Sequence, residues 1–192
     1  KCDGGVMDFV DAYRMLNVLD NTLDKRLCSI TKAVEDLLGD KGRASKVIDG
    51  CKERLKELID SGALEEIGLT GEQVLSLLVY TYQWNESELS EESPQQILYK
   101  ICLERNTYRL SKARSFVIYM LSAMRALGAV STDKPVYRAI DGVALNMSCY
   151  YEKNTVTWSG FSCVTANKYY ALQYAARAKR PVLFEIKGDF RA

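Results

Sequence analysis

The stretch GAVSTDKPVYRAI, residues 128–140, decides the fold, because the spacing of apolar residues changes there from helical to strand-like. Before Gly128, apolar residues recur at every third or fourth position, and no proline occurs before Pro94. After it, residues 136–140 form a short run of β-branched, aromatic and small side chains behind a proline. Helices first, followed by mixed strands and helix, predict an α+β fold and not a doubly wound sheet.

Two apolar stripes near the amino terminus predict helices that end at Gly39 and at Ser61–Gly62. A further helix is expected over residues 6–19, which gives a bundle of three within residues 1–66. We interpret this N-terminal helical region as a solvated bundle or as a docking module for a partner. The two stripes consist of Leu23, Leu27, Ile30, Val34 and Leu37, and of Val47, Ile48, Cys51, Leu55, Leu58 and Ile59.

Two capping boxes predict helix starts in the middle of the chain. Thr70-Gly71-Glu72-Gln73 and Ser93-Pro94-Gln95-Gln96 each place a hydroxyl three residues before a glutamine. The acidic stretch 85–92 between them predicts an exposed loop, and a third helix is expected over residues 110–127. Because these helices have no other apolar partner near in sequence, we expect them to pack on the strand of residues 136–140. The second domain would then run from 67 to 192.

The remainder of the chain predicts two more strands and a helix. Residues 155–159 are rich in β-formers, and residues 181–188 form a second apolar run that begins with a proline. Between them, Thr165 is expected to cap a helix from Ala166 to about Ala178.

Composition excludes several kinds of chemistry. The chain has 192 residues, 47% of them hydrophobic, which suffices for one core or for two small ones. With 26 basic and 25 acidic residues, the net charge of +1 predicts no attraction to nucleic acid. There is no histidine, so neither imidazole catalysis nor His-ligated zinc is available. The six cysteines include no CxxC pair, so we expect no metal site, and both disulfides and buried thiols stay open.

No apolar run is long enough to span a bilayer, and no signal-peptide pattern is found at the amino terminus. We expect a soluble chain, cytoplasmic or secreted. Because the sequence begins with Lys1 and not with methionine, a removed targeting segment stays open.

Arg138 is unusual because it lies in a short apolar strand. A guanidinium costs several kcal/mol to bury without an anion beside it. The anion is either a buried carboxylate of the protein or a phosphate of a ligand, to which the planar fork of arginine can bind at two points.

Five segments in order show what the rest of the chain resembles: LTGEQVLSLLVYTYQ (69–83), QQILYKICLERN (95–106), KPVYRAI (134–140), TVTWSGFSCVT (155–165) and VLFEIKGDFR (182–191). From about Leu69 onward the chain resembles the arginine-specific mono-ADP-ribosyltransferase family with the Arg-Ser-Glu signature. The resemblance implies an enzyme that cleaves NAD, its substrate, releases nicotinamide and transfers ADP-ribose to a side chain of a protein, with arginine expected as the acceptor.

The resemblance also implies an NAD site around Arg138. Arg138 would hold the phosphates, the backbone of Ala139 the nicotinamide amide, and Gly160 and Phe161 the nicotinamide ring. Arg138 and Cys163 are the expected catalytic residues. The expected NAD-binding residues are Tyr137, Arg138, Ala139, Ser159, Gly160, Phe161, Ser162 and Thr165.

Three departures from the family pattern bear on activity. Ala139 replaces a glycine, and Cys163 replaces the serine of the Ser-x-Ser/Thr element, whose last position is Thr165. A thiol is a weaker hydrogen-bond donor than a hydroxyl, so Cys163 would hold a carboxylate only weakly. No residue matches the family's catalytic glutamate, which we expect beyond residue 192, while Glu185 falls on an earlier strand at an exposed or structural position. The alternatives are an inactive relative that serves as a binding or regulatory module, and a helical scaffold with an unrelated tail.

Overall fold

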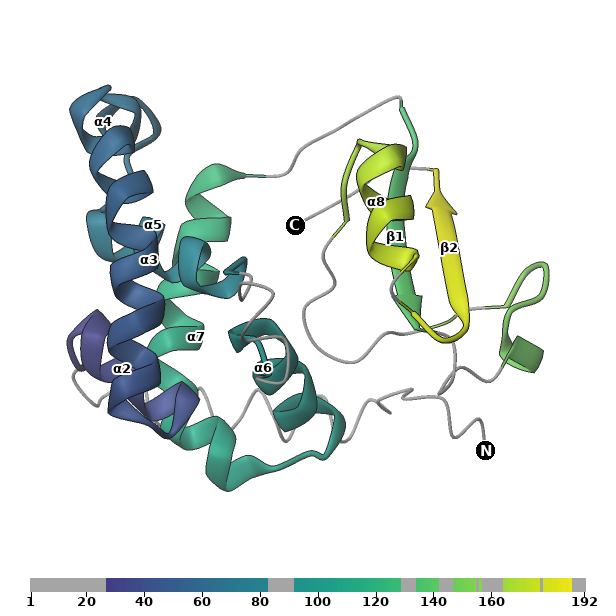
Figure 1. Ribbon diagram of the computed structural model, residues 1–192, viewed down its shortest axis with the longest axis horizontal. Coiled ribbons are helices and arrows are strands. Elements are labelled where there is room, and N and C mark those ends of the chain that lie inside the picture. The colour runs from purple at the N-terminus through teal and green to yellow at the C-terminus, as the bar shows by residue number, and fades with distance from the viewer. Residues whose placement is uncertain are drawn as a thin grey trace. The chain divides into compact units, whose positions relative to one another are not determined.

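The computed structural model describes residues 27–82, 92–128, 134–141, 147–154, 156, 164–176 and 178–187. These residues belong to two compact units that divide after Gly128 (Figure 1). The first unit is helical, and the second combines a helix with two antiparallel strands in its described part. The chain is therefore of the α+β class that the sequence predicts.

The helical unit contains α2 to α7, and a capping side chain lies at the start of each of these helices except α4. Both predicted capping boxes are confirmed: the hydroxyls of Thr70 and Ser93 accept from the backbone of Gln73 and Gln96, whose side chains bond back. The helices are α2 (Ile30–Leu38), α3 (Lys41–Asp60), α4 (Ala63–Ile67), α5 (Gly71–Tyr80), α6 (Pro94–Leu103) and α7 (Thr107–Leu127).

Two helix starts differ from those expected from the apolar stripes. The stripe that predicts α2 includes Leu27, but the helix begins at Ile30, because the Ser29 hydroxyl accepts from the backbone N–H of Lys32. In the same way α7 begins three residues before Leu110, since Asn106 Oδ1 accepts from the backbone N–H of Arg109 at 3.0 Å. Apolar periodicity locates a buried face, whereas the capping residue determines the first turn.

The ends of α2 and α3 lie where the sequence predicts them. α2 ends at Leu38 and is followed by Gly39, whose φ of 71° is the left-handed conformation that glycine adopts without steric cost. α3 ends at Asp60 and is followed by Ser61 and by Gly62, which has a φ of 72°.

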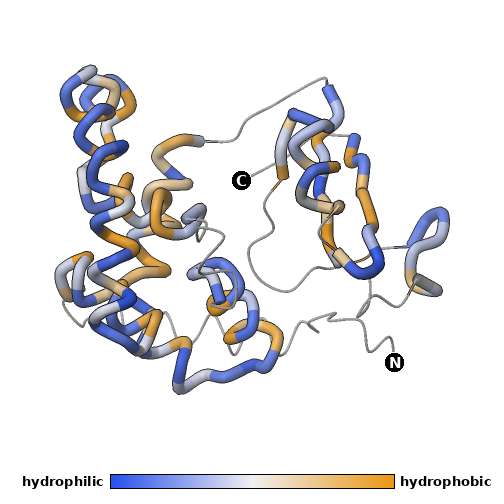
Figure 2. Tube along the Cα trace, in the orientation of Figure 1, coloured by the Kyte–Doolittle hydropathy of each residue, from blue (hydrophilic) through white to orange (hydrophobic). Residues whose placement is uncertain are grey.

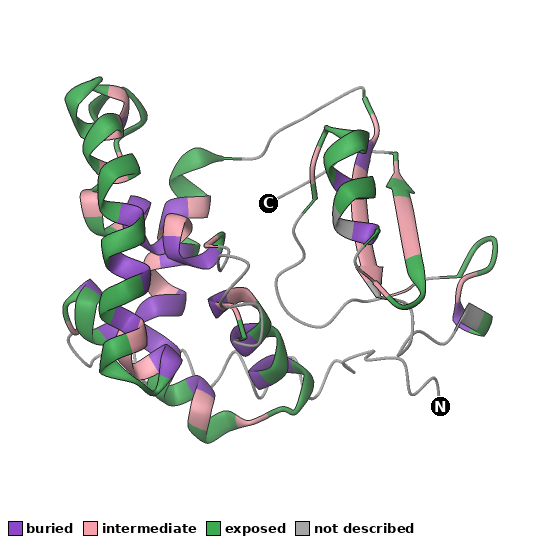
Figure 3. Ribbon diagram, viewed as in Figure 1, coloured by how far each residue is buried: buried purple, intermediate pink, exposed green. Residues whose placement is uncertain are grey.

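The core of the helical unit forms around α7, which packs against α2, α5 and α6. Buried residues and apolar residues coincide on the inner faces of these helices (Figures 2 and 3). α3 also packs against α5, so helices on both sides of residue 67 share one unit. The expectation that α5 and α7 pack on the strand of residues 136–140 rests on the premise that they lack another apolar partner, and that premise is wrong. A transferase-like domain that starts at residue 67 stays a prediction. The least exposed large side chains are Phe116, Leu98, Ile101, Met120, Val34, Val47, Val79 and Val117.

Hydrogen bonds of Tyr119 and Ser122 connect α7 to its neighbours. The Tyr119 hydroxyl donates to the Cys28 carbonyl at 3.0 Å, which holds the residue just before the Ser29 cap. On α5, the Gln73 side chain donates to the Ser122 hydroxyl at 3.1 Å while its carbonyl accepts from Thr70. Gln73 therefore serves both the start of its own helix and the contact with α7.

The described cysteines are in two chemical states. Cys28, Cys51 and Cys102 are free thiols, and the last two are buried. Burial raises the pKa of Cys51 to about 11 and raises that of Cys102 as well. Cys149, in the second unit, is disulfide-bonded, and its partner lies outside the described residues.

The second unit is built on β1 (Val136–Asp141) and β2 (Pro181–Ile186), which pair antiparallel without interruption. α8 (Lys168–Ala175) packs on both strands and buries Ala171 and Ala175. A 3-10 turn over Met147–Cys149 follows β1 in the chain. Two of the three predicted strands are thus confirmed, those of residues 136–140 and 181–188, and β2 ends before residue 188. The third, over residues 155–159, lies outside the described residues apart from Val156. Across the described ranges, no helix combines the length and apolarity needed to cross a membrane.

Adjacent positions of α7 offer a test of this packing. Met120 is 0% exposed and Leu121 is 40% exposed. We expect Met120→Ala to lower the free energy of unfolding by about 2–5 kcal/mol, because it leaves a cavity among packed side chains. Leu121→Ala should cost less than about 1 kcal/mol. Urea denaturation of both variants measures the difference, and equal losses would mean that α7 is not the buried centre of the unit.

Candidate functional site

The structure describes four of the residues predicted to form the NAD site. Tyr137, Arg138 and Ala139 lie in the middle of β1, and Thr165 lies shortly before α8. Five predicted residues lie outside the described ranges, so the structure does not test their positions: Ser159, Gly160, Phe161, Ser162 and Cys163.

β1 is hydrogen-bonded along both of its edges. On one edge it pairs with β2, and on the other the N–H of Tyr137 donates to the Thr165 carbonyl at 2.8 Å. The N–H of Thr165 donates back to the Tyr137 carbonyl at 2.9 Å. This two-bond bridge fixes the segment that leads into α8 beside the residue preceding Arg138. Two segments that are 28 positions apart in the sequence therefore meet at one point of the unit.

Arg138 shares its face of the sheet with aromatic side chains. Its cross-strand partner is Phe184, and side chains of directly paired residues lie on the same face. The ring of Tyr150 lies 5.2 Å from that of Phe184, centroid to centroid, at 41°. All three residues are half-buried. A guanidinium beside a partly accessible aromatic pair can bind an anion that carries a planar ring.

The opposite face of β1 carries a cluster of charged groups, of which the sequence singled out only Glu185. Tyr137 is paired with Glu185, and the Lys168 ammonium lies 5.5 Å from the centroid of the Tyr137 ring. Glu185 is exposed, as the sequence predicts, and its carboxylate lies 3.9 Å from Lys168 Nζ and 2.8 Å from Lys187 Nζ. Strand alternation could have placed Glu185 and Lys187 on one face, but the contact with Lys168 depends on how α8 crosses the strands.

The expected role of Thr165 as a helix cap is wrong. α8 begins at Lys168, and the side chain of Asn167 accepts from the backbone N–H of Tyr170 at 3.1 Å. Thr165 cannot be the cap because both of its backbone polar groups bond to Tyr137 in the bridge. Its hydroxyl instead accepts from the N–H of Asn167 at 3.1 Å and so shapes the turn between bridge and helix.

Comparison with known proteins adds no relative to this description. No protein-family model matches the chain, and neither a curated protein nor a solved structure matches it. Among the residues that the structure describes, no group of three or more histidine, cysteine or acidic side chains is placed to hold a metal ion.

The carboxylate of Glu185 gives a titration test of this charged face. The hydrogen bond from Lys187, followed by the charge of that lysine, lowers the pKa of Glu185 below its ordinary value of 4.5, and the charge of Lys168 adds a smaller effect. The ion pair therefore stabilises the fold above pH 4.5, and this contribution disappears as pH falls through the lowered pKa.

NMR titration of the Glu185 carboxyl should give a midpoint below 4.5 in the unmodified chain. In Lys187→Met the midpoint should rise toward the ordinary value, and in Lys168→Met it should rise less. A larger rise in the Lys168 variant would contradict the arrangement of the two lysines.

Proposed function

We propose that the chain is the NAD-binding part of a mono-ADP-ribosyltransferase that modifies a side chain of a target protein. The observation that carries the proposal is the bridge between Tyr137 and Thr165. It joins the strand of Arg138 to the segment whose sequence, TVTWSGFSCVT, resembles the family's Ser-containing element. An ADP-ribosyltransferase-like core around this bridge is part of the same proposal.

The chemistry assigned to the described residues is binding and orientation. The guanidinium of Arg138 would bind the pyrophosphate of NAD through its two-point fork, and the backbone of Ala139 would hold the carboxamide of nicotinamide. In the reaction, the bond between nicotinamide and ribose breaks and nicotinamide leaves with the bonding electrons. The acceptor side chain then bonds to the ribose carbon and releases a proton. The ribose passes through an oxocarbenium-like state that a neighbouring carboxylate stabilises.

Glu185 does not fit the role of that carboxylate. It is exposed, lies between Lys168 and Lys187, and is paired with Tyr137 on the face of β1 opposite to Arg138. In the proposed reaction the stabilising carboxylate is therefore not that of Glu185.

A second candidate function is an inactive relative that binds NAD or a partner without transferring ADP-ribose. The replacement of the family's serine by Cys163 and the lack of a match to its glutamate in this sequence favour this alternative. In both cases the N-terminal helices would be the docking surface for a protein partner. In the enzyme, the acceptor of ADP-ribose would be a protein.

Substitution of Arg138 tests the binding site. We expect Arg138→Lys to weaken NAD binding by about 1.5–3 kcal/mol, roughly tenfold to a hundredfold, because lysine keeps the charge but loses the two-point contact. Arg180→Lys, at an exposed position just before β2, is the matched control and should leave the affinity unchanged. Isothermal titration calorimetry with NAD measures both. Equal affinity of the Arg138 variant and the unmodified chain would exclude the proposed role of Arg138.

Activity separates the two candidate functions. The intact natural protein that contains this chain is incubated with NAD labelled in the adenine ring and with a mixture of proteins, while a parallel assay follows nicotinamide release. Transfer of label, or slow hydrolysis without transfer, is expected of the enzyme. NAD binding without either reaction would favour the inactive relative, and the lack of NAD binding would reject both.

A further inference from the structure

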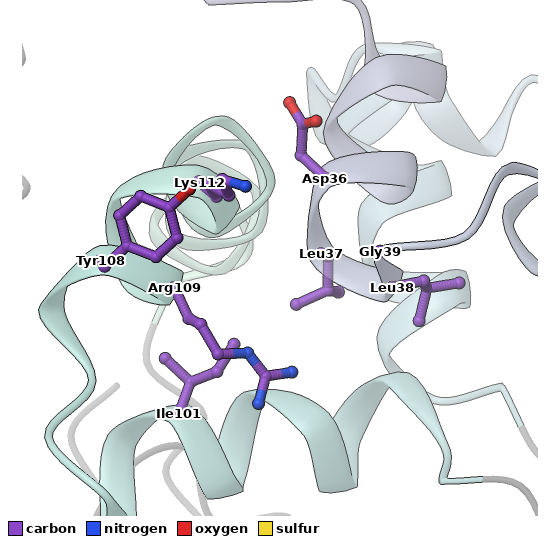
Figure 4. A pocket seen from close by; sticks show the side chains of 8 residues that line it. All are labelled: Asp36, Leu37, Leu38, Gly39, Ile101, Tyr108, Arg109 and Lys112. Atoms are coloured by element: carbon purple, nitrogen blue, oxygen red, sulfur yellow. The ribbon is translucent and has the colours of Figure 1, made fainter.

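The helical unit has a pocket where the end of α2 meets α6 and the first turns of α7. Its volume is about 160 Å³, roughly that of five water molecules in the liquid. A pocket of this size accepts one small group, such as a single terminal residue of a peptide. The lining residues are Asp36, Leu37, Leu38, Gly39, Ile101, Tyr108, Arg109 and Lys112 (Figure 4).

The positive charge of the pocket comes from α7. Arg109 and Lys112 are three positions apart, which places them on one face of the helix. Lys112 lies over the ring of Tyr108, with its ammonium 4.7 Å from the ring centroid. The positive end of α7 itself is already used, because Asn106 accepts from the backbone N–H of Arg109.

The negative charge of the pocket is already paired. Asp36 accepts from Lys32 on its own helix at 2.7 Å, and the same ammonium lies 3.6 Å from Glu35. Within the described ranges, the Arg109 guanidinium has neither an ion pair nor a hydrogen bond, although Arg109 is half-buried. In Figure 4 Asp36 projects away from this guanidinium. A half-buried guanidinium in such surroundings favours an anion.

The other two walls of the pocket limit which kind of molecule can carry the anion. Leu37 and Ile101 are 2% and 1% exposed, so they form an apolar floor. The third wall consists of Asp36 to Gly39 at the end of α2, and the carboxyl end of a helix favours hydrogen-bond donors and disfavours a second negative group. A ligand that satisfies all three walls carries a carboxylate, a short apolar side chain and an N–H donor.

We propose that this pocket binds the C-terminal residue of a peptide or protein that ends in an apolar amino acid. The terminal carboxylate bonds to the fork of Arg109 with support from Lys112. The apolar side chain lies on Leu37 and Ile101, and the terminal amide N–H is directed toward the carbonyl end of α2. This site is independent of the proposed NAD site, since it uses the helical unit alone.

N-acetyl-leucine is the probe for this proposal, because it combines the three groups in one small molecule. The full chain, labelled at Ile and Leu methyl groups, is titrated and followed by NMR. We expect saturable shifts at Leu37 and Ile101 with a dissociation constant on the order of 1 mM. N-acetyl-leucinamide, which has no charge, should bind at least about tenfold more weakly.

Variants of α7 provide the matched comparison. Arg109→Met keeps the apolar stem and should weaken N-acetyl-leucine binding about tenfold or more, with a smaller loss in Lys112→Met. Arg125→Met, at an exposed position in the last turn of the same helix, should bind like the unmodified chain. The amide comparison uses the unmodified chain and so does not depend on the folding of any variant.

The proposal is overturned if Leu37 and Ile101 show no saturable shift at N-acetyl-leucine concentrations up to about tenfold above the expected dissociation constant. It is also overturned if N-acetyl-leucinamide binds as tightly as N-acetyl-leucine, or if Arg125→Met loses as much affinity as Arg109→Met. The remaining contrary result is that inorganic phosphate binds as tightly as N-acetyl-leucine. The last result would mean that charge alone accounts for the site.

Discussion

Burial of the middle of α7 is the constraint on which the helical unit depends. Phe116 and Met120 are completely buried there, and α2, α5 and α6 each place an apolar face against this helix. A short helix such as α2 is marginal in water by itself, so its stability comes mainly from this packing. The polar contacts of α7 with Cys28 and Gln73 then hold the starts of α2 and α5 against this helix.

The second unit depends on a different kind of interaction, namely the hydrogen bonds along both edges of β1. An isolated two-stranded ribbon is marginally stable, and here α8 covers one face while the Thr165 bridge occupies the free edge. As a result the backbone around Arg138 is held on both sides. A binding residue in such a position has a defined direction before any ligand arrives.

The sequence predicts those elements whose signals are local. Capping boxes at Thr70 and Ser93, the glycine after α2 and the strands that start at or just after prolines are all found as expected. It does not predict contacts between distant segments, because periodicity shows that a face is buried but not what covers it. Three contacts are of this kind: that of α5 with α3, the bridge from Thr165 to Tyr137, and that of Lys168 with the Tyr137 ring. The prediction that Thr165 caps α8 was wrong for the same reason, because its backbone bonds to Tyr137 in a long-range bridge. Arg138 was identified by the cost of placing a guanidinium in an apolar strand, whereas the pocket at Arg109 has no local signal.

The packing of the helical unit buries two thiols, and the rates at which they react measure how often the unit opens. Cys51 lies on α3 and Cys102 on α6, and in both cases burial raises the pKa. Each thiol is thus shielded twice, because a reagent cannot reach the sulfur and because little of it is in the reactive thiolate form. Alkylation must wait until a helix separates from its neighbours, so the rate at each cysteine reports how often that part of the bundle opens. Since the two cysteines lie on different helices, a comparison of their alkylation rates distinguishes the separation of one helix from the opening of the whole bundle.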